Sequence, residues 1–170
     1  MNEVRFDPYR VIATLNRHAV RYVIIGGFAA ALRGSPLITH DVDACYARDD
    51  TDLDRLARAL TELDARLRGP GIPEDLPFVV DEETLRNGDH FTFLTNAGPA
   101  DFLGTPAGTD GYADLRAGAE EMDVDGERAA VASLDDLIRM KLRSARLKDQ
   151  AGLEWLRATR DMIERGETPP

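Results

Sequence analysis

Residues 22–28 read YVIIGGF and residues 39–45 read THDVDAC, separated by a break at 34–36 (GSP). Asp41 and Asp43 alternate with apolar residues, and side chains at i and i+2 of a β-strand share one face, so both carboxylates are expected to point the same way. Two like charges this close repel by roughly 4 kcal/mol at an effective dielectric constant of about 20, unless a cation or a proton lies between them. The pair therefore indicates a divalent metal site.

Gly26 and Gly27 lie between an apolar strand expected over 22–25 and an alanine-rich helix expected over 28–33. Glycines let backbone amides approach a phosphate closely, and a helix N-terminus adds a favourable partial charge. For two glycines alone, a tight strand-to-helix turn is the simpler interpretation, and a solvated edge strand is the simpler one for the aspartates. The phosphate-binding interpretation gains weight because carboxylates that hold Mg²⁺ often accompany bound phosphates.

The composition fits one domain over residues 1–165 with a frayed tail at 166–170 in a chain of 170 residues. No apolar run approaches the roughly 20 residues of a membrane span, and the N-terminus lacks the apolar segment of a signal peptide. One cysteine, Cys45, excludes an internal disulfide, so a cytoplasmic protein without a membrane partner is expected. The net charge of −10 argues against nonspecific nucleic-acid binding.

Positive charge is concentrated in residues 138–148 (IRMKLRSARLK), which contain five cations and no acid. On a helix beginning near Leu134, Lys141 falls at the helical spacing of the apolar face, so its ammonium group is expected to point inward. There it would reach a triphosphate, whereas a lysine that snorkels at the edge of that face is the simpler alternative. The arginines of the segment are expected to lie outward: Arg139, Arg143 and Arg146.

The remaining pattern predicts a mixed α+β fold, a sheet flanked by helices. Helices are expected over 8–18, from Asp49 to near Gly69, over 111–120, and twice after Ser133 with a break near 148–149. Strands are expected over 78–80, 90–95 and 100–103, and the Asp125-Gly126 turn predicts a hairpin. Asp101 would then supply a third carboxylate from a neighbouring strand, although a turn aspartate is an equally good interpretation of it alone. The three histidines, His18, His40 and His90, lack the spacing of zinc ligands.

Together, residues 22–27, 39–43 and 100–103 resemble the signature of the polymerase-β-like nucleotidyltransferase superfamily: a hydrophobic strand, a glycine pair, Asp-x-Asp and a later acidic strand. Residues 133–141 and 146–149 resemble its minimal bacterial branch, which includes the AbiEii and MenT-type toxins of toxin–antitoxin systems. The resemblance covers roughly residues 8–160 and implies a nucleotidyltransferase-like mixed sheet with C-terminal helices.

The resemblance also implies roles for individual residues. Gly26 and Gly27 would bind nucleotide phosphates, and Asp101 would be a base or metal ligand. One position departs from the pattern, because relatives often carry Arg four residues before the first aspartate, where this chain has Leu37. The implied metal ligands for Mg²⁺ or Mn²⁺ are Asp41, Asp43 and Asp101; the catalytic set adds Lys141 and Asp149, and the nucleotide-binding set adds Lys141 and Lys148.

The activity implied by the resemblance is transfer of an NMP from an NTP to an acceptor hydroxyl, with pyrophosphate leaving. A toxin-like protein would modify the 3′ end of a tRNA and have a cognate antitoxin as partner. A transferase acting on a small molecule, such as an aminoglycoside, or on a protein hydroxyl is the second interpretation, which the acidic composition slightly favours over RNA. The third is a catalytically silent nucleotide-binding or interaction module, which would have no use for the clustered carboxylates.

Overall fold

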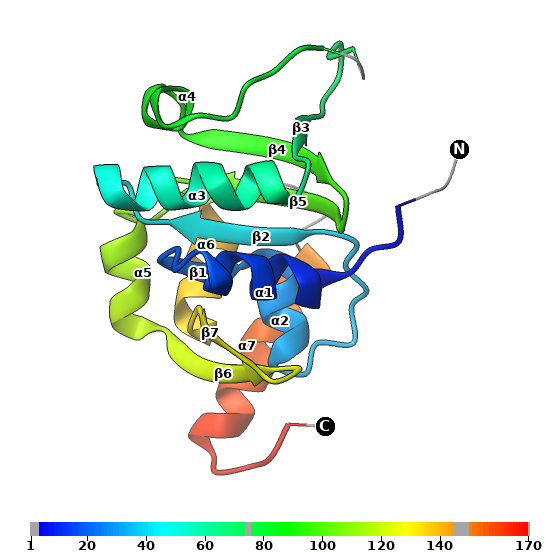
Figure 1. Ribbon diagram of the computed structural model, residues 1–170. Coiled ribbons are helices and arrows are strands. Elements are labelled where there is room, and N and C mark those ends of the chain that lie inside the picture. The colour runs from blue at the N-terminus through cyan, green and yellow to red at the C-terminus, as the bar shows by residue number, and fades with distance from the viewer. Residues whose placement is uncertain (1–3, 74–75, 145–149, 170) are drawn as a thin grey trace.

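The computed structural model of the protein describes residues 4–73, 76–144 and 150–169, whose centre is one mixed sheet (Figure 1). The strand order over these residues is β3–β4–β5–β2–β1–β7–β6. β1 and β2 are antiparallel, whereas β2 and β5 are parallel, as are β1 and β7. The strands are β1 (Tyr22–Ile25), β2 (Val42–Tyr46), β3 (Arg66–Leu67), β4 (His90–Thr95), β5 (Gly98–Leu103), β6 (Glu120–Val124) and β7 (Glu127–Val131).

Helices lie on both sides of this sheet. In the view of Figure 1, α1 and α3 lie in front of it, and α6 and α7 lie behind it. The predicted mixed α+β fold, a sheet flanked by helices with two of them C-terminal, is confirmed. The helices are α1 (Pro8–Arg17), α2 (Gly26–Leu32), α3 (Asp50–Glu62), α4 (Glu82–Asn87), α5 (Tyr112–Gly118), α6 (Leu134–Ser144) and α7 (Gln150–Glu164).

The main core lies on one face of the sheet. It contains the side chains that alternate toward that face along each strand. Phe91 and Phe93 of β4 stack with ring centroids 5.9 Å apart, and Phe93 also packs against Phe102 of β5. The apolar stripe of α3 joins the same cluster, and its Leu53 and Leu56 have no exposed surface. Side chains two apart on a strand share a face, so these phenylalanines point one way while their neighbours point the other.

The opposite face of the sheet is closed at one end and open at the other. At the closed end, Val23 of β1 and Cys45 of β2 have no exposed surface. At the open end, exposed His90, half-buried Thr92 and exposed Leu94 of β4 alternate with buried neighbours. One sheet face is therefore only half covered, which leaves room for a ligand beside the central strands.

Two predicted elements between residues 60 and 82 are wrong. The helix expected to run to near Gly69 ends at Glu62, because Asp64 has a φ of +49° and the backbone N–H of Asn96 donates to the Leu63 carbonyl. The chain then forms β3 against β4, a tertiary pairing that helix periodicity could not reveal. No strand forms over 78–80; instead Asp81 accepts a hydrogen bond from the Thr84 backbone N–H and begins α4.

Helix starts and a hairpin that were predicted from local sequence patterns are confirmed. Asp7 caps α1 by accepting from the Arg10 backbone N–H, and the hairpin of β6 and β7 turns at Asp125 and Gly126, both with positive φ. Ser133 accepts from the Asp136 backbone N–H at the start of α6. The predicted break at 148–149 lies outside the described residues. None of the helices described is both long and apolar enough to cross a membrane.

Candidate functional site

Asp43 and Asp101 are direct neighbours across the centre of the sheet. They are register partners in the parallel pairing of β2 with β5. Ile25 of β1 is the antiparallel partner of Asp43, and Thr92 of β4 is that of Asp101. Register partners project to the same face, so the two carboxylates lie side by side on the half-covered face. Because β2 lies between β5 and β1, the interpretation of the aspartates as part of a solvated edge strand is wrong.

The glycine pair packs directly against this carboxylate row. Gly26 has a φ of +65°, and a Cβ at this position would lie 2.1 Å from Oδ2 of Asp43. A Cβ on Gly27 would lie 3.0 Å from Oγ1 of Thr39. Gly26 therefore requires the absence of a side chain, whereas a Cβ on Gly27 would require Thr39 to move by a few tenths of an ångström. The helix α2 begins at Gly26 itself, two residues earlier than expected.

Asp41 differs from its expected position. It precedes β2 instead of belonging to it, and its Oδ1 accepts a hydrogen bond of 2.9 Å from Oγ1 of Thr39. Within the described ranges, no group of three or more His, Cys, Asp or Glu side chains is close enough to hold a metal ion. The structure thus brings Asp43 and Asp101 together, and the site of three carboxylates stays a prediction.

A cavity of about 470 Å³ opens above the carboxylate row. Gly26, Asp43 and Asp101 line its floor, and α6 forms one wall, from which Lys141 and Arg143 line it. The other lining residues are Ile25, Asp89, His90, Leu103, Thr105, Pro106, Ala107, Leu137, Met140 and Ser144.

The cations on α6 are placed by close contacts with glycines. A Cβ on Gly152 of α7 would lie 3.1 Å from Cε and 3.2 Å from Nζ of Lys141, so Lys141 lies along the backbone of α7. A Cβ on Gly108 would lie 2.7 Å from Cγ of Arg143. Arg143 was expected to lie outward, and it is exposed while it also lines the cavity. The predicted site residues Lys148 and Asp149, together with Arg146, lie outside the described residues.

Asp101 is a carboxylate of the cavity whose pKa is shifted. Burial raises its pKa above the usual aspartate value, and the charge of Asp41 acts in the same direction. Arg68 and His90 act in the opposite direction, with Arg68 Nη2 3.9 Å from Oδ1 and His90 Nε2 3.8 Å from Oδ2. Oδ1 of Asp101 is buried and has no hydrogen-bond partner among the described residues. A buried carboxylate oxygen without a hydrogen bond, beside a second carboxylate, is a donor set that suits a hard divalent cation.

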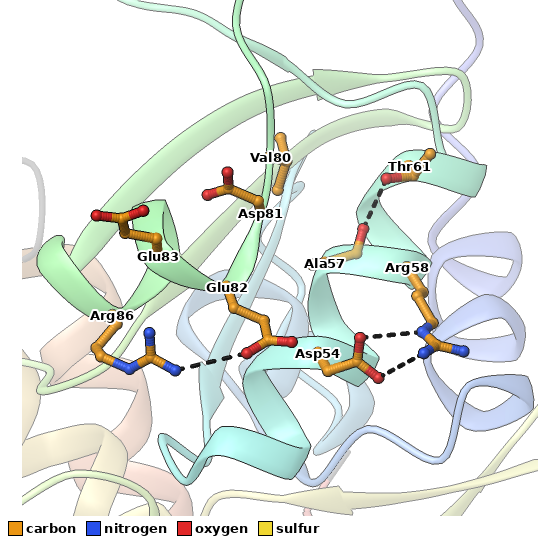
Figure 2. Close-up of a pocket in the computed structure, with 9 residues that line it drawn as sticks. All are labelled: Asp54, Ala57, Arg58, Thr61, Val80, Asp81, Glu82, Glu83 and Arg86. Carbon is orange, nitrogen blue, oxygen red and sulfur yellow. Dashed lines mark hydrogen bonds and ion pairs between the residues drawn. The ribbon is translucent and has the colours of Figure 1, made fainter.

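A larger cavity, of about 580 Å³, lies between α3 and α4 (Figure 2). Its charged side chains pair with one another: Arg58 with Asp54, and Arg86 with Glu82. None of the predicted site residues lines this cavity, neither the glycine pair nor Asp41, Asp43 or Asp101. The smaller cavity is therefore the candidate functional site.

Cys45 shares the aspartate face, as its parity in the strand predicts, but it does no chemistry as a thiolate. It is fully buried, and burial raises its pKa to about 12. A thiol with this pKa is protonated at neutral pH and is a poor nucleophile.

Three groups at this site were not predicted from the sequence. Thr39 was not assigned a role, although it contacts both Gly27 and Asp41. His90 was considered only as a zinc ligand, although the alternation over 90–95 places it on the same face as Thr92. Arg68 follows a strand of two residues, a length too short to give a periodic signal, and only the sheet pairing brings it to Asp101.

Comparison with known proteins gives matches in structure alone. No family model matches the chain, and no curated protein sequence matches it. The fold is shared with TM1012 of Thermotoga maritima, described as a candidate nucleotidyltransferase (TM-score 0.56, 16% identity, 89% of this chain and 91% of that chain). It is shared with the lincosamide antibiotic adenylyltransferase LnuA (0.57, 12%, 88% and 94%) and with the antibiotic-resistance factor ANT(2'')-Ia (0.56, 17%, 91% and 82%). At these identities the likeness establishes a nucleotidyltransferase fold.

Proposed function

We propose that the protein is a metal-dependent nucleotidyltransferase, which moves an NMP from an NTP to an acceptor hydroxyl. The observation that carries the proposal is the pairing of Asp43 with Asp101 against the Gly26 turn, with Lys141 lining the same cavity. Carboxylates, a close-approach backbone turn and a cation are the groups that phosphoryl transfer uses for positioning and charge stabilisation.

Asp43 and Asp101 would hold Mg²⁺ or Mn²⁺, with Asp41 as the adjacent third ligand. A bound divalent ion would supply charge neutralisation at the phosphate oxygens and a lower pKa of the attacking hydroxyl. The resemblance of the sequence to the polymerase-β-like superfamily and the shared fold of LnuA and ANT(2'')-Ia support the same assignment.

Residues of this chain would act on both the acceptor hydroxyl and the leaving pyrophosphate. The acceptor oxygen forms a bond to the α-phosphorus, the bond from that phosphorus to pyrophosphate breaks, and the hydroxyl proton moves to the Asp101 carboxylate. Burial raises the pKa of Asp101, which makes this carboxylate a stronger proton acceptor. Lys141 offsets the negative charge that develops on pyrophosphate, and the turn at Gly26 and Gly27 lies against the phosphates.

Two classes of acceptor follow from different comparisons. The C-terminal sequence resemblance to MenT-type toxins supports a tRNA 3′ end, together with a cognate antitoxin and a bacterial toxin–antitoxin role. The shared fold of LnuA, a lincosamide antibiotic adenylyltransferase with bound lincomycin, supports a small-molecule acceptor. In both classes the transferred group and the carboxylates are the same.

The experiment that tests the function is transfer of label from each α-³²P-labelled NTP, with Mg²⁺ or Mn²⁺, to total tRNA, to antibiotics and to the protein itself. The matched control is Asp43→Asn, which keeps the shape of the side chain and removes its charge. We expect labelling of one acceptor class that requires the metal and is lost in Asp43→Asn.

The alternative is a silent nucleotide-binding module, for which the replacement of a usual arginine by Leu37 is the motivating observation. Metal-dependent NTP binding that is lost in Asp43→Asn, without transfer to any acceptor, would favour that alternative. Absence of NTP binding would contradict both.

A further inference from the structure

The sheet order dictates from which side an acceptor would reach the cavity. This step rests on the proposed function, in which the attacking hydroxyl and the leaving pyrophosphate lie on opposite sides of the α-phosphorus. Across the half-covered face, the strands run from Ile25 and the glycine turn on β1, through Asp43 on β2 and Asp101 on β5, to Thr92 on β4. Lys141 lines the cavity from α6, which packs against α2 beside β1. The acceptor therefore approaches over β4 and β3.

The face of β4 and β3 is open and bears cationic side chains. Arg66 is the register partner of exposed Leu94, and the backbone N–H of Arg68 donates to the Thr92 carbonyl at 2.9 Å. Arg66 and Arg68 therefore project to the same face as the two aspartates, and Arg68 reaches Asp101. His90 lines the cavity from the same face, with its side chain 47% exposed.

These cations are available to a ligand. The side chains of Arg66 and Arg68 are 64% and 42% exposed, and the pairing of Arg68 with Asp101 is long at 3.9 Å. Arg66 pairs with Asp64, and exposed surface pairs of this kind exchange easily with other anions. The nearby acid Asp89 is engaged with Arg48 and with the Thr105 backbone N–H.

We propose that the acceptor is a phosphate-bearing alcohol, whose phosphate group is bound by Arg66 and Arg68, with His90 beside the hydroxyl. Guanidinium groups bind phosphate oxygens with two parallel hydrogen bonds, and residues at i and i+2 of an extended backbone lie about 7 Å apart, as Arg66 of β3 and Arg68 just after it do. A polycationic amino sugar on the same face would meet two guanidinium groups of like charge. Both a small sugar phosphate and the 3′ end of an RNA carry the required chemistry.

The test measures acceptor binding while a non-hydrolysable NTP analogue and Mg²⁺ occupy the nucleotide site. The probes are a six-nucleotide RNA with a free 3′-hydroxyl, ribose 5-phosphate, unphosphorylated ribose and tobramycin, which carries several ammonium groups. The variant is Arg66→Gln/Arg68→Gln, and the matched control is Arg58→Gln, an exposed arginine of α3 at the cavity of Figure 2. Thermal melting of each variant verifies folding.

We expect a phosphate-bearing probe to bind, ribose and tobramycin to bind at least tenfold more weakly, and the double variant to lose about tenfold or more in affinity for that probe. Arg58→Gln should bind as the unmodified protein does. Binding of the RNA alone assigns a polymer as the source of the phosphate, and binding of ribose 5-phosphate assigns a small molecule.

Two results would overturn the inference and leave the proposed function intact: tighter binding of tobramycin than of either phosphate probe, or phosphate binding that the double variant does not weaken. Failure of the unmodified protein to bind the NTP analogue, measured before any acceptor is added, would instead contradict the proposed function on which the inference rests.

Discussion

At the scale of single residues, Gly26 meets two requirements at one position. Its φ of +65° is costly for any residue with a Cβ, and a Cβ would also collide with the carboxylate of Asp43. The sequence shows only that a glycine follows a strand. The contact with Asp43 depends on the pairing of β1 with β2, which makes Ile25 the register partner of Asp43.

Gly26→Ala should therefore reduce nucleotidyl transfer by about 100-fold or more, since a displacement of about 1 Å at a reacting centre has effects of this size. The matched control is Gly71→Ala, which has a φ of +78° but no atom within 4 Å of the added Cβ. It should lose only the roughly 1–2 kcal/mol of the backbone strain and keep its activity. Equal loss of activity in both variants, measured with the labelled NTP, would contradict this account of Gly26.

Asp101 is a residue whose burial is costly to the metal-free protein. Because burial raises its pKa, the charged form at neutral pH is less favourable in the folded protein than in the unfolded chain. Asp101→Asn should abolish transfer and at the same time raise the Tm of the metal-free protein at pH 7. Differential scanning calorimetry in EDTA is the measurement, and a lower Tm for the variant would show that the attraction to Arg68 and His90 outweighs burial.

At the scale of elements, α6 and α7 form one unit around Lys141. The side chain of Lys141 lies along α7 at Gly152, where a Cβ would come within 3.2 Å of its ammonium nitrogen. The end of a flexible side chain moves easily, so the helix tolerates a methyl group there while the position of the charge changes. The packing of α6 against α7 thus determines where the ammonium group of Lys141 lies in the cavity.

Gly152→Ala should raise the KM for the NTP several-fold without lowering the Tm, because alanine favours an α-helix by about 1 kcal/mol relative to glycine. Lys141→Met, which removes the charge, should have the larger effect on transfer. A Tm that falls by several degrees in Gly152→Ala would show instead that the helix pair itself is disrupted.

A second junction joins α5 to α6 through charge. Arg139 of α6 pairs with Asp114 of α5 at 2.9 Å and with Asp136 at 2.8 Å. The hydrogen bond from Arg139 holds the pKa of Asp114 below its usual value, assisted by the Asp110 backbone N–H. Arg139, expected to be a solvated cation, therefore connects two elements.

Because the pKa of Asp114 is lower in the folded protein, its contribution to stability is complete above the usual aspartate pKa of 3.8 and is lost as the pH falls through the lowered value. Asp114→Asn should cost about 1 kcal/mol or less at pH 7, since the pair is partly exposed. Urea unfolding at pH 7 and near pH 3 measures this, and the difference between the two proteins should shrink at the lower pH. A difference that is constant with pH would exclude the ion pair as its source.

At the scale of the whole molecule, a chain of net charge −10 presents positive charge around one cavity. Lys141 and Arg143 line it from α6, with Arg68 close to Asp101. The carboxylates of β2 and β5 carry negative charge at the sheet, and the side chains of α6 carry positive charge beside them. Such focusing favours a metal–nucleotide complex over either component alone.

NTP and Mg²⁺ together should therefore raise the Tm more than the sum of their separate effects. A ligand at 100 times its Kd stabilises the folded state by about 2.7 kcal/mol. Thermal shift measurements with NTP, with Mg²⁺ and with both provide the test, and Asp43→Asn should lose the joint effect. Stabilisation by NTP that does not depend on Mg²⁺ would contradict a carboxylate-held metal.

Elements with local signals could be predicted from the amino-acid sequence. The cap at Asp7, the Asp125-Gly126 turn, and the strands over 22–25 and 90–95 all follow from side chains within a few residues of one another. The glycine pair and the aspartates were also visible, because their residue types are rare in buried strands.

Which of these residues come into contact depends on the pairing of strands that are far apart in the chain. The pairing of β2 with β5 joins Asp43 to Asp101, and the pairing of β3 with β4 brings Arg68 to the same face. The early end of α3 at Glu62 likewise depends on a hydrogen bond from the distant Asn96. Such contacts arise between segments far apart in the chain, where hydrogen bonding and burial across the sheet outweigh local propensity.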